Sequence, residues 1–463
     1  MSGRIIVNGF EMNCLAHMAH GLWAHPRDRR RGYTGLEYWI ELAALLERGR
    51  LDALFIADVL GVYDTFRSSP DAAVAAGAQI PANDPALVVP AMAVGTTNLS
   101  FAVSVSTSYE SPFGHARRFS TLDHLTQGRV GWNVVTSYLP NAAKNFGWER
   151  MVLHDERYDR ADEYLDVCYQ LWEASWEEDA VSVDGTTQRY ADPAKVHPID
   201  HRGDFFSVAG PHLCEPSPQR TPVIYQAGNS ARGRKFAARH AECVFLSGVV
   251  PASLRRSADD VRTQASAAGR APDDVKILTS LSVIVAEDET AVCRKREELQ
   301  RWVNVDGMLA QYCGTTGFDL AAMSRSDVVT YRDTDHGQGG AALFTSDVQR
   351  PVTVGDIVDS MTQLGETTLL AIGTPVQVAD QMEEWIDEIG LDGFNIIQFL
   401  TPETFTDFID MVVPELQRRG RYQTEYTPGT FREKLFGPGR ALLPDRHPGG
   451  LVRPPACVPS DQP

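Results

Sequence analysis

The run ALFIADV at residues 53–59 is apolar over its first five positions and ends near a carboxylate, Asp58. A short run that is apolar on both faces is typical of a strand in a parallel sheet that helices cover on both sides. Seven further runs of this kind are spread along the chain, at 5–10, 99–107, 129–137, 221–228, 242–248, 275–286 and 393–400. The sequence therefore predicts eight parallel strands.

Helical patterns separate these strands. Between the first two strands, one apolar helix face comprises Leu36, Trp39, Ile40, Ala43 and Leu46. Before the last strand, Thr374, Pro375 and Gln377 form the signature of a capped helix start. Eight strands that alternate with helices predict an α/β protein with a (β/α)8 TIM barrel.

An open doubly wound sheet is the alternative to the barrel. It is disfavoured because no G-x-G-x-x-G follows a strand and no Gly-Lys pair forms a P-loop. A bare barrel needs ~250 residues, so about 200 residues remain for insertions. We expect one barrel domain over 1–440, with large insertions near 60–84, 177–220 and 287–372, and an extended tail over 441–463.

Composition narrows the class of protein. The formal net charge is -18, and the longest basic run is Arg29 to Arg31, which argues against a nucleic-acid partner. The seven cysteines contain no C-x-x-C pair, so neither a disulfide framework nor a structural zinc site is expected. No apolar run reaches ~18 residues, which predicts no membrane span and a cytoplasmic location.

In a (β/α)8 barrel the active site lies at the carboxyl ends of the strands. The polar residues that end or follow the predicted strands are Cys14, His17, Asp58, Ser104, Asn133, Ser137, Tyr138, Gly228, Asn229 and Ser230. For Asp58 two interpretations remain open, a helix cap or ion pair on one side and a ligand contact on the other.

The segment QAGNSARGRKFAARH (226–240) runs from a strand through Gly228 and Ser230 into a helix that carries Arg232, Arg234 and Lys235. Backbone N–H groups at a helix start, together with basic side chains, favour an anion site. An ordinary capped helix is the alternative.

His17, His20 and His154 are candidates for a metal site or an active site. His17 and His20 are three residues apart, but a metal site is disfavoured because further strand-end ligands are missing. A covalent role for Cys14 is not indicated by its spacing from His17. In HDERYDRADEY (154–164), His154 and Tyr158 lie one helical turn apart and could point into one site.

Taken together, four segments resemble the bacterial luciferase-like flavin monooxygenases: RVGWNVVTS (129–137), HDERYDRADEY (154–164), TPVIYQAGNSARG (221–233) and FTDFIDMVVPELQRRG (405–420). The resemblance is to the branch with nitrilotriacetate, dibenzothiophene-sulfone and dimethyl-sulfide monooxygenases. Within it, HGLWAHP (20–26), YESPFGHARR (109–118) and REKLFG (432–437) look most similar to the long-chain alkane monooxygenases.

The resemblance implies a barrel homodimer, or a dimer of dimers, that uses reduced FMN from a separate NAD(P)H:flavin reductase. It implies transfer of one oxygen atom of O2 to an organic substrate. The flavin-lining positions that it implies are Asp58, Ser104, Asn133, Ser137, Tyr138, His154, Tyr158, Ala227, Gly228, Asn229 and Ser230. The loop at Ser230 is then the phosphate site, where the residues themselves predict an anion.

For substrate chemistry the alkane-oxidising pattern implies four residues, all present here: Cys14, His17, Tyr63 and Gln79. The chain departs from that pattern at Tyr138 and Gln311, where the alkane enzymes hold histidine. We therefore expect an apolar small-molecule substrate, alkane-like first. The alternatives are an organosulfur compound or a halogenated aromatic, and beyond these a deazaflavin-dependent dehydrogenase or a non-catalytic flavin-binding barrel.

Overall fold

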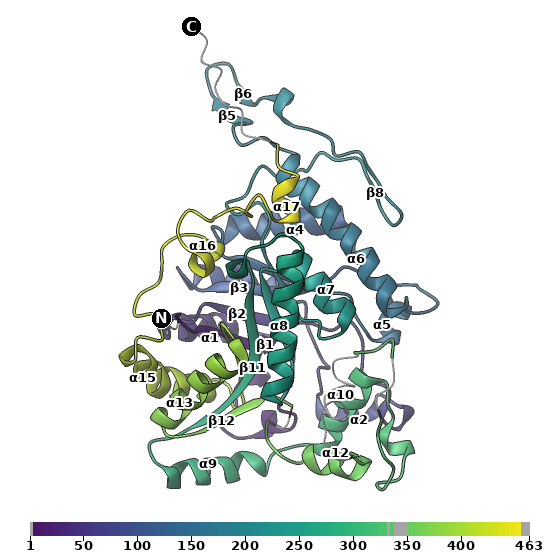
Figure 1. The fold of residues 1–463 in the computed structure, drawn as a ribbon, viewed down its shortest axis with the longest axis vertical. Helices are drawn as coiled ribbons and strands as arrows, with labels where there is room; N and C mark the ends of the chain where they lie inside the picture. The colour runs from purple at the N-terminus through teal and green to yellow at the C-terminus, as the bar shows by residue number, and fades with distance from the viewer. Residues whose placement is uncertain (1–2, 331–333, 338–350, 366, 455–463) are drawn as a thin grey trace.

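The computed structural model describes residues 3–330, 334–337, 351–365 and 367–454. Eight parallel strands close into a barrel in the order β1, β2, β3, β4, β9, β10, β11, β13. Their bounds are Ile6–Met12, Ala53–Ala57, Ser100–Ser106, Val130–Val135, Val223–Gln226, Cys243–Leu246, Lys276–Val285 and Gly393–Ile397. Each predicted run overlaps one of these strands, although β1 extends two residues past the predicted run 5–10, so the prediction of a (β/α)8 barrel is confirmed (Figure 1).

A ninth strand, β12 (Leu369–Gly373), was not predicted. It pairs with β11 outside the closed ring. The pairing is possible because β11 is ten residues long: its residues 278–282 pair with β13, and its residues 281–285 pair with β12. The five-residue run of β12 lies at the end of the predicted insertion 287–372.

The helices that alternate with the strands are α1 (Leu36–Arg48), α4 (Pro112–Leu125), α6 (His154–Tyr169), α7 (Ala231–His240), α8 (Pro251–Ala267), α13 (Pro375–Trp385) and α14 (Glu403–Asp407). In α1 the buried face is formed by Trp39, Leu42, Ala43 and Leu46. Leu36 is 59% exposed, so the buried face differs slightly from the predicted one. The capping box that opens α13 is confirmed.

The insertions carry their own elements. The first contains α2 (Asp71–Ala76) and the short turn Phe66–Ser68. Two hairpins in 177–220, β5 (Val181–Asp184) with β6 (Arg189–Ala191) and β7 (His201–Arg202) with β8 (Ser207–Val208), project away from the barrel (Figure 1). The third contains α9 (Glu289–Gln300), α10 (Val305–Thr316) and α12 (Val354–Ser360).

The helices α2, α10 and α12 share a hydrophobic cluster that is separate from the main core, and Tyr63 and Met308 belong to it. This cluster packs over the carboxyl ends of the strands. The insertions therefore form a roof above the position where a barrel holds its active site.

The other α-helices among the described residues are α3 (Val89–Val94), α5 (Pro140–Asn145), α15 (Val413–Arg418), α16 (Phe431–Phe436) and α17 (Pro448–Leu451). The predicted extended tail is only partly described. Up to residue 454 it folds against α6, where the buried His447 ring lies 5.6 Å from that of Tyr169. That part is therefore packed rather than extended, while residues 455–463 lie outside the described residues.

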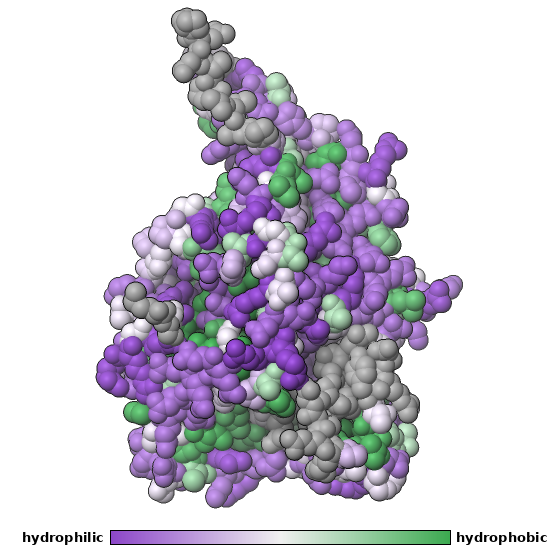
Figure 2. All heavy atoms as spheres, viewed as in Figure 1, coloured by the Kyte–Doolittle hydropathy of each residue, from purple (hydrophilic) through white to green (hydrophobic). Residues whose placement is uncertain are grey.

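The surface is largely hydrophilic over α8 and its surroundings (Figure 2), which agrees with the formal net charge of -18. Among the described residues, no helix is both long and apolar enough to cross a bilayer.

Candidate active site

A cavity of about 390 Å³ opens at the carboxyl ends of β1, β2, β3, β4 and β9. The predicted site residues that line it are His17, Asp58, Tyr63, Gln79, Ser104, Asn133, Ser137, Tyr138, His154, Tyr158, Ala227, Gly228, Asn229 and Ser230. Of the predicted set, Cys14 alone is not a lining residue. These predicted residues come from the ends of five strands, from the first insertion and from α6, and they meet in one space.

One end of this cavity is built for an anion. Ser230 caps α7, and its side chain accepts a hydrogen bond from the Gly233 backbone N–H at 3.0 Å. A Cβ atom at Gly228 or Gly233 would lie 2.8 Å from the Tyr158 hydroxyl. Glycine at both positions thus lets the loop backbone approach Tyr158 closely, at the positive end of the helix.

The basic side chains that the sequence suggested for this anion site are engaged elsewhere. Arg232 donates to Asp159 at 2.8 Å and to Asp162 at 2.6 Å, both on α6. Arg234 pairs with Asp260 on α8. Neither arginine lines the cavity, so this part of the interpretation is wrong.

The cavity is instead lined by Arg157, which sequence reasoning missed. Its two terminal nitrogens donate to the carbonyl oxygens of Val152 and Asp335, at 2.6 and 2.7 Å, and its buried Nε has no hydrogen-bond partner within the part of the chain that the structure describes. Burial lowers the pKa of this guanidinium. Arg157 lies one helical turn after His154, a spacing that could have revealed it.

The middle of the cavity holds a polar pair on adjacent strands. Ser104 and Asn133 are direct neighbours in the β3–β4 register, and the Asn133 amide nitrogen donates to the Ser104 hydroxyl at 2.7 Å. The Asn133 carbonyl oxygen is buried and has no partner among the described residues. It is an acceptor that a bound ligand could satisfy.

Asp58 follows β2 and also lines the cavity. Burial raises the pKa of its carboxyl group to about 8, and the nearby charges of Asp84 and Glu110 add to the shift. No salt bridge to Asp58 occurs within the described part of the chain, which removes the ion-pair interpretation. At neutral pH this carboxyl group is mainly protonated and uncharged.

A chain of hydrogen bonds connects Tyr138, Tyr63 and Gln79. The Gln79 amide nitrogen donates to the His17 carbonyl oxygen at 2.9 Å, so its oxygen faces Tyr63 and accepts the Tyr63 proton at 2.8 Å. Tyr63 has no second proton, and Tyr138 must therefore donate across the 2.8 Å contact between the two hydroxyls. Tyr138 then offers the cavity only a hydrogen-bond acceptor.

The two histidines after β1 are neutral. Burial lowers the pKa of His17 to about 3 and that of His20 to about 4. His20 Nε2 lies 2.7 Å from the Gln311 side-chain oxygen, and the Gln311 amide nitrogen contacts the Met18 sulfur. No group of three or more His, Cys, Asp or Glu that could hold a metal ion is found in the described chain.

Cys14 lies close to this region without reaching the cavity. Its backbone pairs with Ala82 of the first insertion, and the thiol is buried. Burial, followed by the nearby charge of Glu11, raises the pKa of this thiol. Cys14, which the resemblance implies for substrate chemistry, therefore does not line this cavity, unlike His17, Tyr63 and Gln79.

The apolar part of the cavity comes from residues that no strand-end argument could identify. They are Met18, Leu60, Met308, Tyr312 and Met361. Three of these five lie in the insertion 287–372. The arrangement thus has an anion-binding end, a polar middle and an apolar end beneath the roof.

Residues 18–393 match the signature of the luciferase-like monooxygenases, and the chain belongs to that family. It is 52% identical over 448 residues to the long-chain alkane monooxygenase of Geobacillus thermodenitrificans, which covers 96% of this chain and 97% of that protein. It is 44% identical over 463 residues to the dimethyl-sulfide monooxygenase of Hyphomicrobium sulfonivorans, covering 98% and 94%.

Solved structures agree with these relatives. A crystal structure of long-chain alkane monooxygenase matches with a TM-score of 0.92 and 52% identity, over 98% of this chain and 100% of that one. A riboflavin lyase, solved with a modified FMN and riboflavin, matches with a TM-score of 0.92 and 37% identity, over the same shares. The predicted family, barrel and monooxygenase class are confirmed.

Proposed function

We propose that this protein is the oxygenating component of a two-component monooxygenase that uses reduced FMN. A separate NAD(P)H:flavin reductase supplies the reduced flavin, and one oxygen atom of O2 is transferred to an apolar small molecule. The observation that carries the proposal is the single cavity, with an anion-binding end and an apolar end. A phosphorylated flavin has one anionic end and one largely apolar ring system, which matches this polarity.

The residues present fit FMN. Ser230, Arg157 and the start of α7 would hold its phosphate, because they combine backbone donors, a helix dipole and a guanidinium. Asn133 and Ser104 would hold the polar edge of the ring, where the Asn133 oxygen lacks a protein partner. The structure solved with a modified FMN supports the same cofactor.

Bound reduced FMN supplies the electrons that activate O2. The residues around the apolar end keep that region free of charge and water: His17 is neutral, Asp58 is protonated at neutral pH, and the roof of α2 and α10 closes over them. Such a dry, uncharged environment suits oxygen transfer to an apolar carbon or sulfur atom.

A long-chain alkane is the first candidate substrate, because the chain shares His17, Tyr63 and Gln79 with the alkane-oxidising pattern and is similar to such an enzyme along 96% of its length. An organosulfur compound is the second candidate. It is favoured by the similarity to the dimethyl-sulfide monooxygenase, and the chain departs from the alkane-oxidising pattern at Tyr138. A halogenated aromatic compound is the third candidate substrate.

The experiment is oxygen uptake and product analysis with FMN, a flavin reductase, NADH and a panel of alkanes, sulfides and halogenated aromatics. Substrate-dependent oxygen uptake with an oxygenated product is expected. A bound flavin without substrate-dependent uptake would indicate a non-catalytic flavin barrel instead. Activity with a deazaflavin cofactor that does not consume O2 would indicate the dehydrogenase alternative.

We further propose that the protein is cytoplasmic and forms a homodimer or a dimer of dimers. Light scattering of the purified protein tests the number of subunits.

A further inference from the structure

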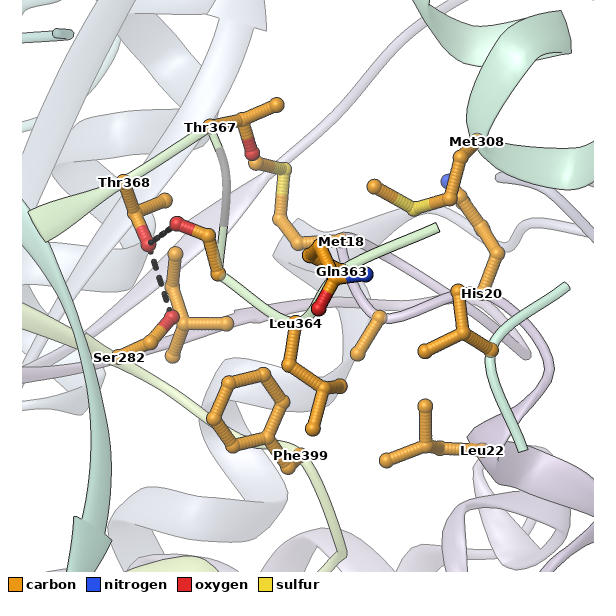
Figure 3. A pocket seen from close by; sticks show the side chains of 14 residues that line it. Met18, His20, Leu22, Ser282, Met308, Gln363, Leu364, Thr367, Thr368 and Phe399 are labelled. Carbon is orange, nitrogen blue, oxygen red and sulfur yellow. Dashed lines mark hydrogen bonds between the residues drawn. The ribbon is translucent and has the colours of Figure 1, made fainter. Parts of the chain in front are cut away.

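Beside the catalytic cavity lies a second, smaller recess of about 20 Å³. Three residues line both spaces: Met18, Met308 and Thr367. In Figure 3 these three lie on one side of the recess, and Leu22, Leu364 and Phe399 lie on the opposite side. The recess therefore continues the catalytic cavity beyond a boundary that consists mainly of two methionine side chains.

The wall opposite the methionines is buried and apolar. Leu22, Leu364 and Phe399 are at most 5% exposed and belong to a hydrophobic cluster of their own. Met308, in contrast, belongs to the cluster of the roof. The recess thus lies where two separately packed clusters meet, a place where side chains can move apart without opening either core.

Two hydroxyl groups of the recess satisfy each other. Ser282 and Thr368 bond at 2.9 Å (Figure 3). The neutral ring of His20 bonds through Nε2 to Gln311, and its buried Nδ1 is left as an acceptor without a partner among the described residues. A volume of about 20 Å³ holds roughly one small group. Together with the apolar wall of Leu22, Leu364 and Phe399, this small volume selects the uncharged end of a chain.

We propose that this recess receives the far apolar end of the substrate, with Met18 and Met308 as an adjustable partition and Leu364 and Phe399 as the limit on chain length. This inference rests on the proposed function, because it concerns the substrate of the same cavity. Methionine is suited to such a partition, since its unbranched thioether adapts to gaps of different shape. A longer chain would enter the recess as the two methionines rotate.

The first test is a competition between linear substrates of increasing length under turnover. Leu364→Ala should raise the relative kcat/KM for the longer members by about fourfold per added methylene group that the recess can bury. Leu364→Phe should shift the preference toward shorter members. The matched control is Leu400→Ala, since Leu400 is buried in the same cluster without lining the recess. An equal chain-length preference in Leu364→Ala and Leu400→Ala would overturn the proposal.

The second test needs no turnover. Crystals of the wild-type protein are soaked with a linear alkane brominated at both ends, and anomalous scattering locates the bromine atoms. One bromine is expected between Met308 and Leu364. The proposal is overturned if bromine is found in the catalytic cavity alone or is not bound at all. It is also overturned if xenon binds in the recess of xenon-treated crystals while bromine does not. That last result would indicate a gas site. If the wild-type protein oxygenates no linear substrate, the proposed function fails, and the bromine position alone decides the role of the recess.

Discussion

At the scale of single residues, the site depends on which charged groups face the cavity and which are paired outside it. Arg157 lines the cavity, whereas Arg232 does not, because carboxylates of α6 hold it. A guanidinium with an unpartnered nitrogen can add a charge-assisted hydrogen bond to a phosphate, whereas a paired one cannot.

We therefore expect Arg157→Gln to weaken FMN binding by about tenfold or more, the effect of losing one charge-assisted contact. Ser230→Asp should weaken binding as well, because it places a negative charge at the start of α7. Fluorescence titration with FMN measures both. Arg232→Gln is the control, and equal losses in Arg157→Gln and Arg232→Gln would contradict the assignment.

A second prediction concerns substrate preference, and it follows from the direction of the hydrogen bonds through Tyr138. Tyr138→Phe removes a hydroxyl oxygen that this chain of hydrogen bonds offers to the cavity as an acceptor. The kcat/KM for a substrate with a hydroxyl group should fall by about tenfold relative to its unsubstituted analogue. The distant Tyr426→Phe, which loses a hydrogen bond to the Leu51 carbonyl, should leave that ratio as in the wild type. An unaltered ratio in Tyr138→Phe would show that Tyr138 does not contact the substrate.

The raised pKa of the Asp58 carboxyl group predicts that the stability of the protein depends on pH. Its folded-state pKa, raised to about 8 by burial, lies above that of an unfolded carboxyl group. The folded protein therefore holds a proton that the unfolded chain releases, and the free energy of unfolding falls as the pH rises from about 4 to about 8. In flavin-free protein, Asp58→Asn should remove this fall.

Urea unfolding of flavin-free protein at pH 5 and pH 8.5 provides the measurement. Asp445→Asn, which changes an exposed carboxylate, should keep the wild-type difference between the two pH values. If Asp58→Asn also keeps that difference, the Asp58 carboxyl group ionises normally in the folded protein.

At the scale of elements, the roof helices are fitted to the site more tightly than their sequences suggest. Gly314 in α10 packs on Tyr63, and a Cβ atom at this position would lie 2.2 Å from the Tyr63 ring. Alanine in a helix interior is usually favourable compared with glycine. Here we expect the close approach of the helix to Tyr63 to outweigh that preference.

Gly314→Ala should lower the free energy of unfolding by about 1–3 kcal/mol, the usual cost of overpacking a core. Gly114→Ala in α4 is the matched control, because a Cβ atom there meets nothing closer than 3.5 Å. That control should be neutral or stabilise by up to about 1 kcal/mol. Chemical denaturation compares the two, and a stabilised Gly314→Ala protein would show that α10 can move away from Tyr63.

At the scale of the whole molecule, the end of the chain closes the barrel on the side away from the active site. Arg432 on α16 is 1% exposed and bonds to Glu242, which precedes β10, at 2.7 and 3.0 Å. The same guanidinium donates to the carbonyl oxygens of Thr221 and Ala441. One buried ion pair thus joins segments 190 residues apart.

Arg432→Met should destabilise the protein by about 3–5 kcal/mol, because it leaves the Glu242 carboxylate buried without its partner. Adding Glu242→Gln should recover much of that loss, since the unpaired charge is then gone. The free energy of unfolding of the two variants is the measurement. If the double variant is no more stable than Arg432→Met, the loss comes from the backbone contacts of Arg432 instead.

The amino-acid sequence by itself determined the eight barrel strands and most of the site. Continuous apolar runs such as 53–59 are local signals, because a strand buried on both faces needs apolar side chains at every position. Once the strands are parallel, their carboxyl ends must meet at one edge. Residues as distant along the chain as Asp58, Asn133 and Ser230 could therefore be assigned to one cavity in advance.

Only the tertiary structure decided features that depend on contacts through space. Cys14 and Met18 both follow β1, but the pairing of Cys14 with Ala82 keeps its thiol out of the cavity, whereas Met18 lines it. Likewise, the carboxylates on α6 that hold Arg232 leave Arg157 to line the cavity. The recess is formed by Ser282 and by residues within 18–22, 303–308, 363–365, 367–368 and 397–399. No local pattern encodes such a space, because it exists only where those segments meet.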